Sequence, residues 1–139
     1  MADKSKVKEM PNPTKGDGNR LWQVTGTTFL IPEQYDVIEV VGAGAYGTVV
    51  AAKDRNDPDN LIAIKKMEKV FEHKVFAQRT LRELKIMRLL QHENVLSMKT
   101  IINPVSRENF NELYIVSDLM ETDLSTIIKS KQALSDEHI

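Results

Sequence analysis

The chain has 139 residues, of which 41% are hydrophobic and 28% charged, and its formal net charge is −1. This composition is typical of a globular domain, and the charge gives no support for a nucleic-acid or membrane partner held by bulk electrostatics. The absence of cysteine excludes disulfides, thiolate catalysis and cysteine-bound zinc. No apolar run approaches the roughly 18 residues of a membrane helix, and no apolar segment follows the N-terminal lysines as in a secretory signal, so we expect a cytoplasmic or nuclear protein.

The first half of the chain predicts a polar tail followed by strands. Residues 1–20 carry almost nothing to bury and predict a disordered tail. Residues 21–32 predict one short strand that is stopped by Pro32. Residues 35–41, 48–53 and 61–67 predict three strands joined by short turns, which favours an antiparallel meander. In the first strand of the meander, the alternation of side chains places four residues on one face: Tyr35, Val37, Glu39 and Val41.

The second half predicts one prominent helix, two further strands and a short helix. Residues 75–91 lack Gly and Pro and follow a helical spacing, whereas residues 94–102 and 111–118 resemble strands. Residues 124–131 predict a short helix with Thr122 or Asp123 as its cap. Ser135 and the acidic residues after it then indicate another helix start. An isolated turn cannot offset its nucleation cost, so we expect this chain to be the N-terminal piece of a larger protein.

A glycine-rich turn lies between the first two strands of the meander, and it has the pattern Gly42-x-Gly44-x-x-Gly47. Glycines bind phosphate because their backbone N–H groups can approach the oxygens closely. The same letters mark dinucleotide-binding folds, but these need a helix after the third glycine, and Thr48-Val49-Val50 is a poor helix start. The turn is not a Walker A loop, and a plain hairpin turn remains the alternative.

Ala63 and Lys65 share one face of the third strand, because side chains alternate along a strand. A small residue followed two positions later by a lysine makes a flat apolar floor that leads to a cation, which suits an adenine over Ala63 and phosphates near Lys65. The alternative is a surface lysine at a strand end, and we assign that interpretation to Lys66, which points the other way.

Glu83 lies in line with Phe76, Met87 and Leu90 on the predicted helix. A carboxylate on an apolar stripe is costly to bury unless it is paired. A Lys65–Glu83 ion pair would satisfy both residues, whereas a solvated helix glutamate is the alternative.

Together these residues resemble the amino-terminal lobe of a eukaryotic protein kinase, and more narrowly of a mitogen-activated protein kinase of the extracellular-signal-regulated branch. The resemblance covers about residues 26–139. Five motifs carry it: Gly42-Ala43-Gly44-Ala45-Tyr46-Gly47-x-Val49, Ile62-Ala63-Ile64-Lys65, Gln78-Arg79-Thr80-Leu81-Arg82-Glu83-Leu84-Lys85, His92-Glu93-Asn94-Val95 and Asp118-Leu119-Met120-Glu121-Thr122-Asp123-Leu124.

The resemblance implies an α+β fold, with a five-stranded antiparallel sheet, one main helix, a hinge and the start of a helical lobe. It divides the chain into a tail at residues 1–24, the lobe with its hinge at 25–121 and the beginning of a second lobe at 122–139.

The resemblance also implies roles for single residues around an ATP–Mg²⁺ site. Residues 42–47 would cover the phosphates, which Lys65 would hold while Glu83 positions it. The adenine would lie between Val41, Val49 and Ala63. The backbones of Asp118 and Met120 would bond the edge of the adenine, and Asp123 would meet the ribose.

Two further roles concern regulation and specificity. Arg82 would face a phosphorylated threonine of the activation loop. Ser117 would be the residue behind the adenine, and its small size predicts an enlarged back pocket that accepts adenine analogues with bulky substituents.

The remaining catalytic parts of the family, including the catalytic aspartate and the magnesium ligands, are expected beyond Ile139. The 139 residues alone are therefore expected to be inactive. The resemblance implies protein substrates and an upstream activating kinase for the whole protein. The near-neutral charge argues against nucleic acid or a membrane as partner. The lobe alone could associate with itself through uncovered apolar surface. A non-catalytic interaction module that competes for partners of the full kinase is the second interpretation, and a dinucleotide-binding domain is a weaker third.

Overall fold

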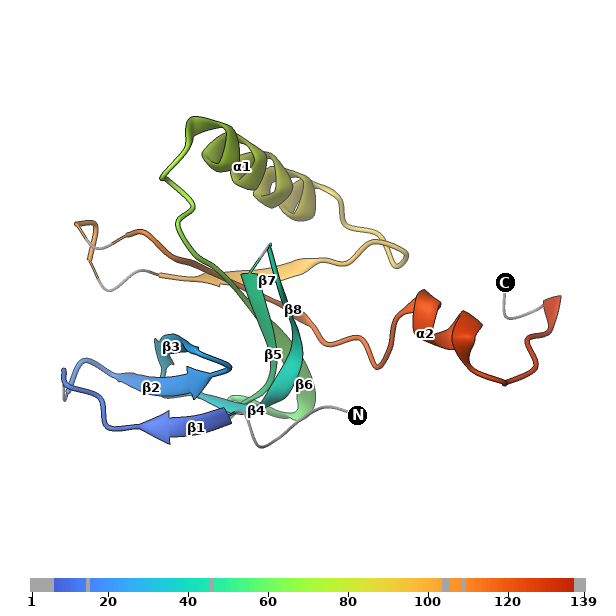
Figure 1. Cartoon of the computed structure of the whole chain (residues 1–139), viewed down its shortest axis with the longest axis horizontal. Coiled ribbons are helices and arrows are strands. Elements are labelled where there is room, and N and C mark those ends of the chain that lie inside the picture. Colours follow the sequence, from blue (N-terminus) through green and yellow to red (C-terminus); the bar gives the residue numbers. More distant parts are fainter. Residues whose placement is uncertain (1–6, 15, 46, 104–105, 109, 137–139) are drawn as a thin grey trace.

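The computed structural model describes residues 7–14, 16–45, 47–103, 106–108 and 110–136. It contains two sheets and two helices, which Figure 1 labels along the chain. The strands are β1 (Val7–Met10), β2 (Asn19–Val24), β3 (Thr27–Pro32), β4 (Tyr35–Gly44), β5 (Gly47–Asp54), β6 (Asp57–Met67), β7 (Met98–Ile102) and β8 (Leu113–Asp118). The helices are α1 (Lys74–Leu89) and α2 (Leu124–Lys129).

The larger sheet has five antiparallel strands in the order β4-β5-β6-β8-β7. Its first three strands form the predicted meander, and α1 lies beside β7 and β8 (Figure 1). The α+β fold with one main helix is therefore confirmed. The strand predicted at residues 94–102 begins only at Met98, because the segment after α1 runs through a turn in which His92 Nδ1 accepts the N–H of Asn94 at 3.1 Å.

The prediction of a disordered tail over residues 1–20 is wrong where the chain is described. β1, β2 and β3 form a second antiparallel sheet, and residues 21–32 contribute two strands to it instead of one. Thr25 and Gly26 both have positive φ, 42° and 87°, which is the backbone of a tight hairpin turn. β1 has only four residues, and both the packing of Val7 against the buried core and the pairing with β2 hold it in place.

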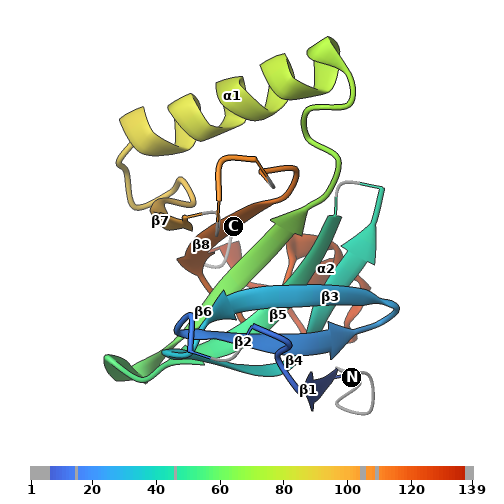
Figure 2. The ribbon, with the colours of Figure 1, turned by 90° about the vertical axis from the view of Figure 1, so that its left-hand side faces the viewer.

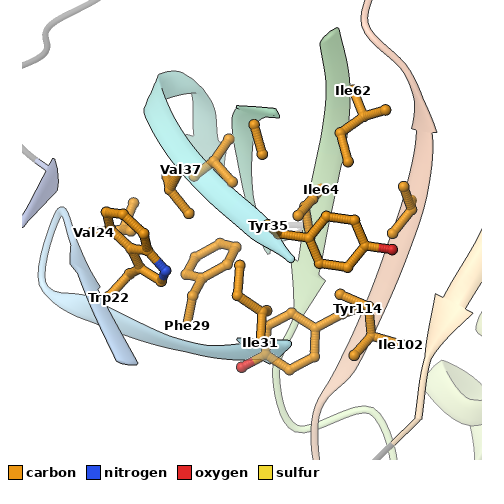
Figure 3. Close-up of a cluster of buried hydrophobic side chains, with 13 residues drawn as sticks. Trp22, Val24, Phe29, Ile31, Tyr35, Val37, Ile62, Ile64, Ile102 and Tyr114 are labelled. Atoms are coloured by element: carbon orange, nitrogen blue, oxygen red, sulfur yellow. The ribbon is translucent and has the colours of Figure 1, made fainter. Parts of the chain in front are cut away.

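The smaller sheet covers one face of the larger sheet. In Figure 2, β2 and β3 cross in front of β4, β5 and β6. Thirteen buried side chains fill the space between the sheets, and Figure 3 shows Phe29 and Ile31 of β3 directed toward Ile64 and Tyr114. We call this side the closed face.

The opposite side of the larger sheet carries α1 at one end only, and we call it the open face. Leu84 and Met87 of α1 pack against a second, smaller core formed by Val70, Leu113 and Ile115. α1 has 16 residues, and no helix in the described part of the chain is long and apolar enough to cross a bilayer.

A bulge in β4 overturns part of the predicted alternation. The register between β4 and β5 shifts between Val37 and Glu39, so that Val40 packs against the same core as Val37. Glu39 and Val41 consequently lie along the open face, away from Tyr35 and Val37. The register shifts a second time between Val40 and Gly42, so the reversal is confined to the residues between the two shifts, and no sequence alternation reveals either of them.

Candidate functional site

The open face of the larger sheet contains a cleft of about 960 Å³. Strands β4, β5, β6 and β8 form its floor, α1 contributes one wall, and the segment from Asp118 to α2 contributes another. Nine predicted site residues line it: Val41, Val49, Ala63, Lys65, Glu83, Ser117, Asp118, Met120 and Asp123. Residues that are far apart in the sequence therefore meet in one cavity.

An ion pair lies inside this cleft. Lys65 Nζ donates to Glu83 Oε1 at 2.8 Å, which joins β6 to α1 as the sequence predicts. The two side chains are 29% and 41% exposed, so the pair is partly hydrated, and its contribution to stability is about 0–1 kcal/mol. The pair therefore sets the position of the ammonium group more than it holds the fold together.

The glycine-rich turn is a hairpin between β4 and β5, in which Gly44 pairs with Gly47. β5 begins at Gly47, so a strand stands where a dinucleotide-binding fold requires a helix. Gly42 and Gly44 have open space at the Cβ position, but a Cβ on Gly47 would lie 2.0 Å from the carbonyl oxygen of Lys66. Gly47 also has φ +111°, so both the backbone and the packing require glycine here. Tyr46 lies outside the described residues.

Apolar and small side chains form the part of the floor next to Lys65. Ala63 pairs with Ala51 on one side and with Ser117 on the other, and both Ala63 and Ser117 are buried. Val41 and Val49 line the cleft from β4 and β5. This surface could take a flat aromatic ring, because its side chains are short and leave room above the sheet.

The segment after β8 places backbone groups and two acidic residues, Glu121 and Asp123, along the cleft. Met120 is 67% exposed and Asp118 ends β8. Asp123 accepts hydrogen bonds from the N–H of Thr126 at 2.9 Å and from its hydroxyl at 2.7 Å, which makes Asp123 the N-cap of α2. The hydroxyl and then the N–H of Thr126 lower the pKa of Asp123, so its carboxylate stays ionised at neutral pH.

The structure adds residues that the sequence interpretation missed. Lys99 of β7 pairs with Asp118 at 2.9 Å, and Asp118 in turn raises the pKa of Lys99. Val95 and Leu96 line the cleft although they lie in the loop after α1. Two consecutive apolar residues in an otherwise polar loop were the available signal for these last two.

Two further predictions have different outcomes. Arg82 is exposed on α1, outside the cleft, and its predicted role is untested. The interpretation of Lys66 as a surface lysine is wrong, because its side chain is only 2% exposed. It points to the closed face, where the smaller sheet covers it.

Comparison with known proteins identifies relatives over nearly the whole chain. Residues 35–139 match the family described as protein kinase domain. The chain is 45% identical over 130 residues to mitogen-activated protein kinase 7 of Arabidopsis thaliana, covering 94% of this chain and 35% of the relative. It is 44% identical over 134 residues to extracellular signal-regulated kinase 1 of Dictyostelium discoideum, covering 93% and 25%. Mitogen-activated protein kinase 3 of Oryza sativa is 45% identical over 135 residues, covering 93% and 35%. The chain thus spans about a third of the length of these relatives or less.

Proposed function

Because this chain belongs to the protein kinase family, and within it forms an amino-terminal lobe of the mitogen-activated type, we propose that its cleft binds ATP for transfer of the γ-phosphate to protein serine or threonine. The observation that carries the proposal is the Lys65–Glu83 ion pair inside a cleft with an apolar floor. An ammonium group that already has one carboxylate partner keeps two N–H donors for phosphate oxygens.

Different residues of the cleft would contact different parts of the nucleotide. Val41, Val49 and Ala63 would enclose the adenine, and the backbones of Asp118 and Met120 would bond its edge. Asp123 would accept a ribose hydroxyl through lone pairs that Thr126 leaves free. Residues 42–47 would close over the phosphates, where the missing side chains expose N–H groups. A volume of about 960 Å³ is in the range of cofactor sites.

ATP supplies the transferable phosphoryl group, and Mg²⁺ would neutralise its charge. We assign the magnesium ligands and the proton-accepting aspartate to the region of the family fold that follows residue 139. The 139-residue chain by itself should therefore bind nucleotide without transferring phosphate. Incubation of this chain with ATP, Mg²⁺ and a generic protein substrate should release no ADP above background.

Regulation and partners extend the same proposal. Arg82 is exposed on α1, the helix that carries Glu83, so a phosphate bound by Arg82 would act on the position of Glu83. An upstream kinase and protein substrates in the cytoplasm or nucleus are the partners we propose for the whole protein. Met120, Leu124 and Ile128 are exposed apolar side chains on one stretch of chain, and they would support self-association of the isolated lobe.

Titration of the 139-residue chain with a fluorescent ATP analogue tests the proposal. Lys65→Met should weaken binding by about ten- to a hundredfold, because the phosphates lose their cation. Lys53→Met is the matched control, since Lys53 is exposed on β5 outside the cleft and its loss should leave the affinity unchanged. Absence of saturable binding by the unmodified chain would instead support the second candidate, a non-catalytic interaction module.

A further inference from the structure

Lys65 and Lys66 are neighbours on β6 whose side chains point to opposite faces of the sheet. Lys65 reaches the cleft and is 29% exposed, whereas Lys66 is only 2% exposed on the closed face. Lys66 is the one charged residue among the buried residues of the described chain. An ammonium group in such a place is costly unless its lost water is replaced by oxygen atoms.

Four oxygen atoms surround the ammonium group of Lys66. Glu112 Oε1 lies 2.8 Å from Nζ and Glu68 Oε1 lies 3.0 Å from it. The carbonyl oxygen of Thr28 and the hydroxyl of Thr27 lie at 2.5 Å and 3.2 Å. These groups come from β3, from the segment after β6 and from the segment before β8. One cation therefore ties the smaller sheet to the larger sheet.

The partners of Lys66 are themselves held in place. The rings of Phe29 and Tyr114 lie 5.9 Å and 5.8 Å from Nζ and pack edge to face on each other. The hydroxyl of Tyr114 donates to Glu112 Oε2 at 2.9 Å and accepts the N–H of Leu30 at 3.3 Å. The Lys66 side chain is therefore enclosed by two rings and four oxygen atoms, and it is only 2% exposed.

The same backbone supports Lys65, which lines the cleft, and the end of the glycine-rich turn, whose described residues 42–45 and 47 lie outside the cleft lining. A Cβ on Gly47 would lie 2.0 Å from the carbonyl oxygen of Lys66, so the end of the glycine-rich turn rests directly on this residue. Thr48, the next residue of β5, pairs with Lys66 across the sheet. Lys65 precedes Lys66 by one peptide bond, so a displacement of the Lys66 backbone also moves the ammonium group of Lys65.

We propose that Lys66 is a positioning residue for the phosphate side of the cleft. The oxygen atoms on the closed face hold its side chain, and its backbone then holds the Gly47 turn and the Lys65 ammonium in register with each other. This inference rests on the proposed function, to which it adds a residue that never touches the nucleotide. A purely structural clamp would stabilise the fold in the same way but would leave the chemistry at Lys65 unchanged in the folded protein.

The test measures the reactivity of Lys65 in the 139-residue chain well below its unfolding transition. The probe is 5′-fluorosulfonylbenzoyl adenosine, whose sulfonyl group reacts with a lysine amine beside a bound adenosine and releases fluoride. Mass spectrometry of the Lys65 peptide gives the rate, with and without ATP as protecting ligand. Lys66→Met should slow the modification by about tenfold, because misplacement of a reacting group costs rate steeply.

Three further variants complete the experiment. Val24→Ala is the matched control, since Val24 is fully buried in the same core but is not among the groups around Nζ of Lys66. Its folded form should react at the unmodified rate, as should that of Lys66→Arg, which keeps the charge. Glu112→Gln should slow the reaction less than Lys66→Met does, and it replaces that variant as the deciding one if Lys66→Met does not fold.

The outcomes separate the two proposals. If folded Lys66→Met is modified at Lys65 as fast as Val24→Ala, Lys66 is only a structural clamp and the inference is overturned. Glu112→Gln decides in the same way if Lys66→Met does not fold. Absence of ATP-protectable modification of Lys65 in the unmodified chain would overturn the proposed function itself. A slow Lys66→Met with unchanged Val24→Ala and Lys66→Arg would support both.

Discussion

The two faces of the larger sheet show how one strand can serve opposite purposes. On the closed face, Lys66 lies among apolar side chains and four oxygen atoms, and the smaller sheet excludes water. On the open face, Lys65 has one carboxylate partner and borders a cleft of about 960 Å³. Burial with complete pairing makes a charge rigid, whereas partial exposure with one partner leaves it able to bind something else.

The closed face should therefore carry the stability of the domain. Phe29→Ala removes a fully buried ring that packs on Tyr114 and should lower the free energy of unfolding by about 3–5 kcal/mol. Urea titration followed by the fluorescence of Trp22 measures this loss. Phe71→Ala removes a ring that is 49% exposed and packs outside this core, and it should cost clearly less. Equal losses in the two variants would contradict the assignment of stability to the closed face.

Gly47 joins the two faces, and its replacement should damage both. Gly47→Ala places a methyl group 2.0 Å from the carbonyl oxygen of Lys66 at a residue with φ +111°. We expect a loss of about 1–3 kcal/mol in the free energy of unfolding, together with weaker binding of the fluorescent ATP analogue. Gly42→Ala has open space around its Cβ and is the matched control for the steric part. If Gly47→Ala and Gly42→Ala lowered the free energy of unfolding equally, the close approach of Gly47 to the Lys66 carbonyl oxygen would have no measurable effect on stability.

The open face should tolerate a change that alters specificity without unfolding the domain. Ser117→Met fills space at the back of the cleft and should weaken binding of an adenine analogue with a bulky N6 substituent by about tenfold, or about 1.4 kcal/mol. Affinity for ATP itself should change much less. Competition against the fluorescent ATP analogue gives both values, and Ser125→Met on the exposed side of α2 is the control. Undiminished affinity for the bulky analogue would refute the enlarged back pocket.

The smallest expected effect lies at the rim of the closed face, where Asp36 pairs with Arg55 at 2.9 Å and also with Arg20. The Arg55 hydrogen bond, aided by Arg20, lowers the pKa of Asp36 to about 2. Its stabilisation is complete above the ordinary pKa of about 4 and is lost as the pH falls toward about 2. Solvent screening of this partly exposed carboxylate limits the amount to less than about 1 kcal/mol.

Asp36→Asn should consequently flatten the acid limb of a stability–pH curve measured by urea unfolding, and leave the plateau above pH ~5 lowered by a constant amount. Asp59→Asn, at an exposed position of β6, should leave the curve unchanged. If the stability of Asp36→Asn falls at low pH as steeply as that of the unmodified chain, the ion pairs of Asp36 with the two arginines contribute nothing measurable to the pH dependence of stability.

Local sequence determined the meander, the glycine hairpin and α1. Alternating apolar residues, turn residues and a long stretch without Gly or Pro act over a few residues, so they can be recognised in the chain itself. The Lys65–Glu83 pair was also predictable, because a strand lysine and a helix glutamate on an apolar stripe each need a partner. Nine of the residues that line the cleft were predicted from family motifs together with this pairing.

Only the tertiary structure determines that Lys66 is buried, that the N-terminal strands form a second sheet and that β4 is bulged. Whether a lysine at an outward-facing strand position meets water or oxygen ligands depends on what covers that face, and here β3 covers it. β1 is too short, in an otherwise polar stretch, to predict a strand, and its order comes from pairing with β2 and from the packing of Val7 against the core. Each of these features depends on contacts between segments distant in the chain, whereas periodicity reports only which residues share a face.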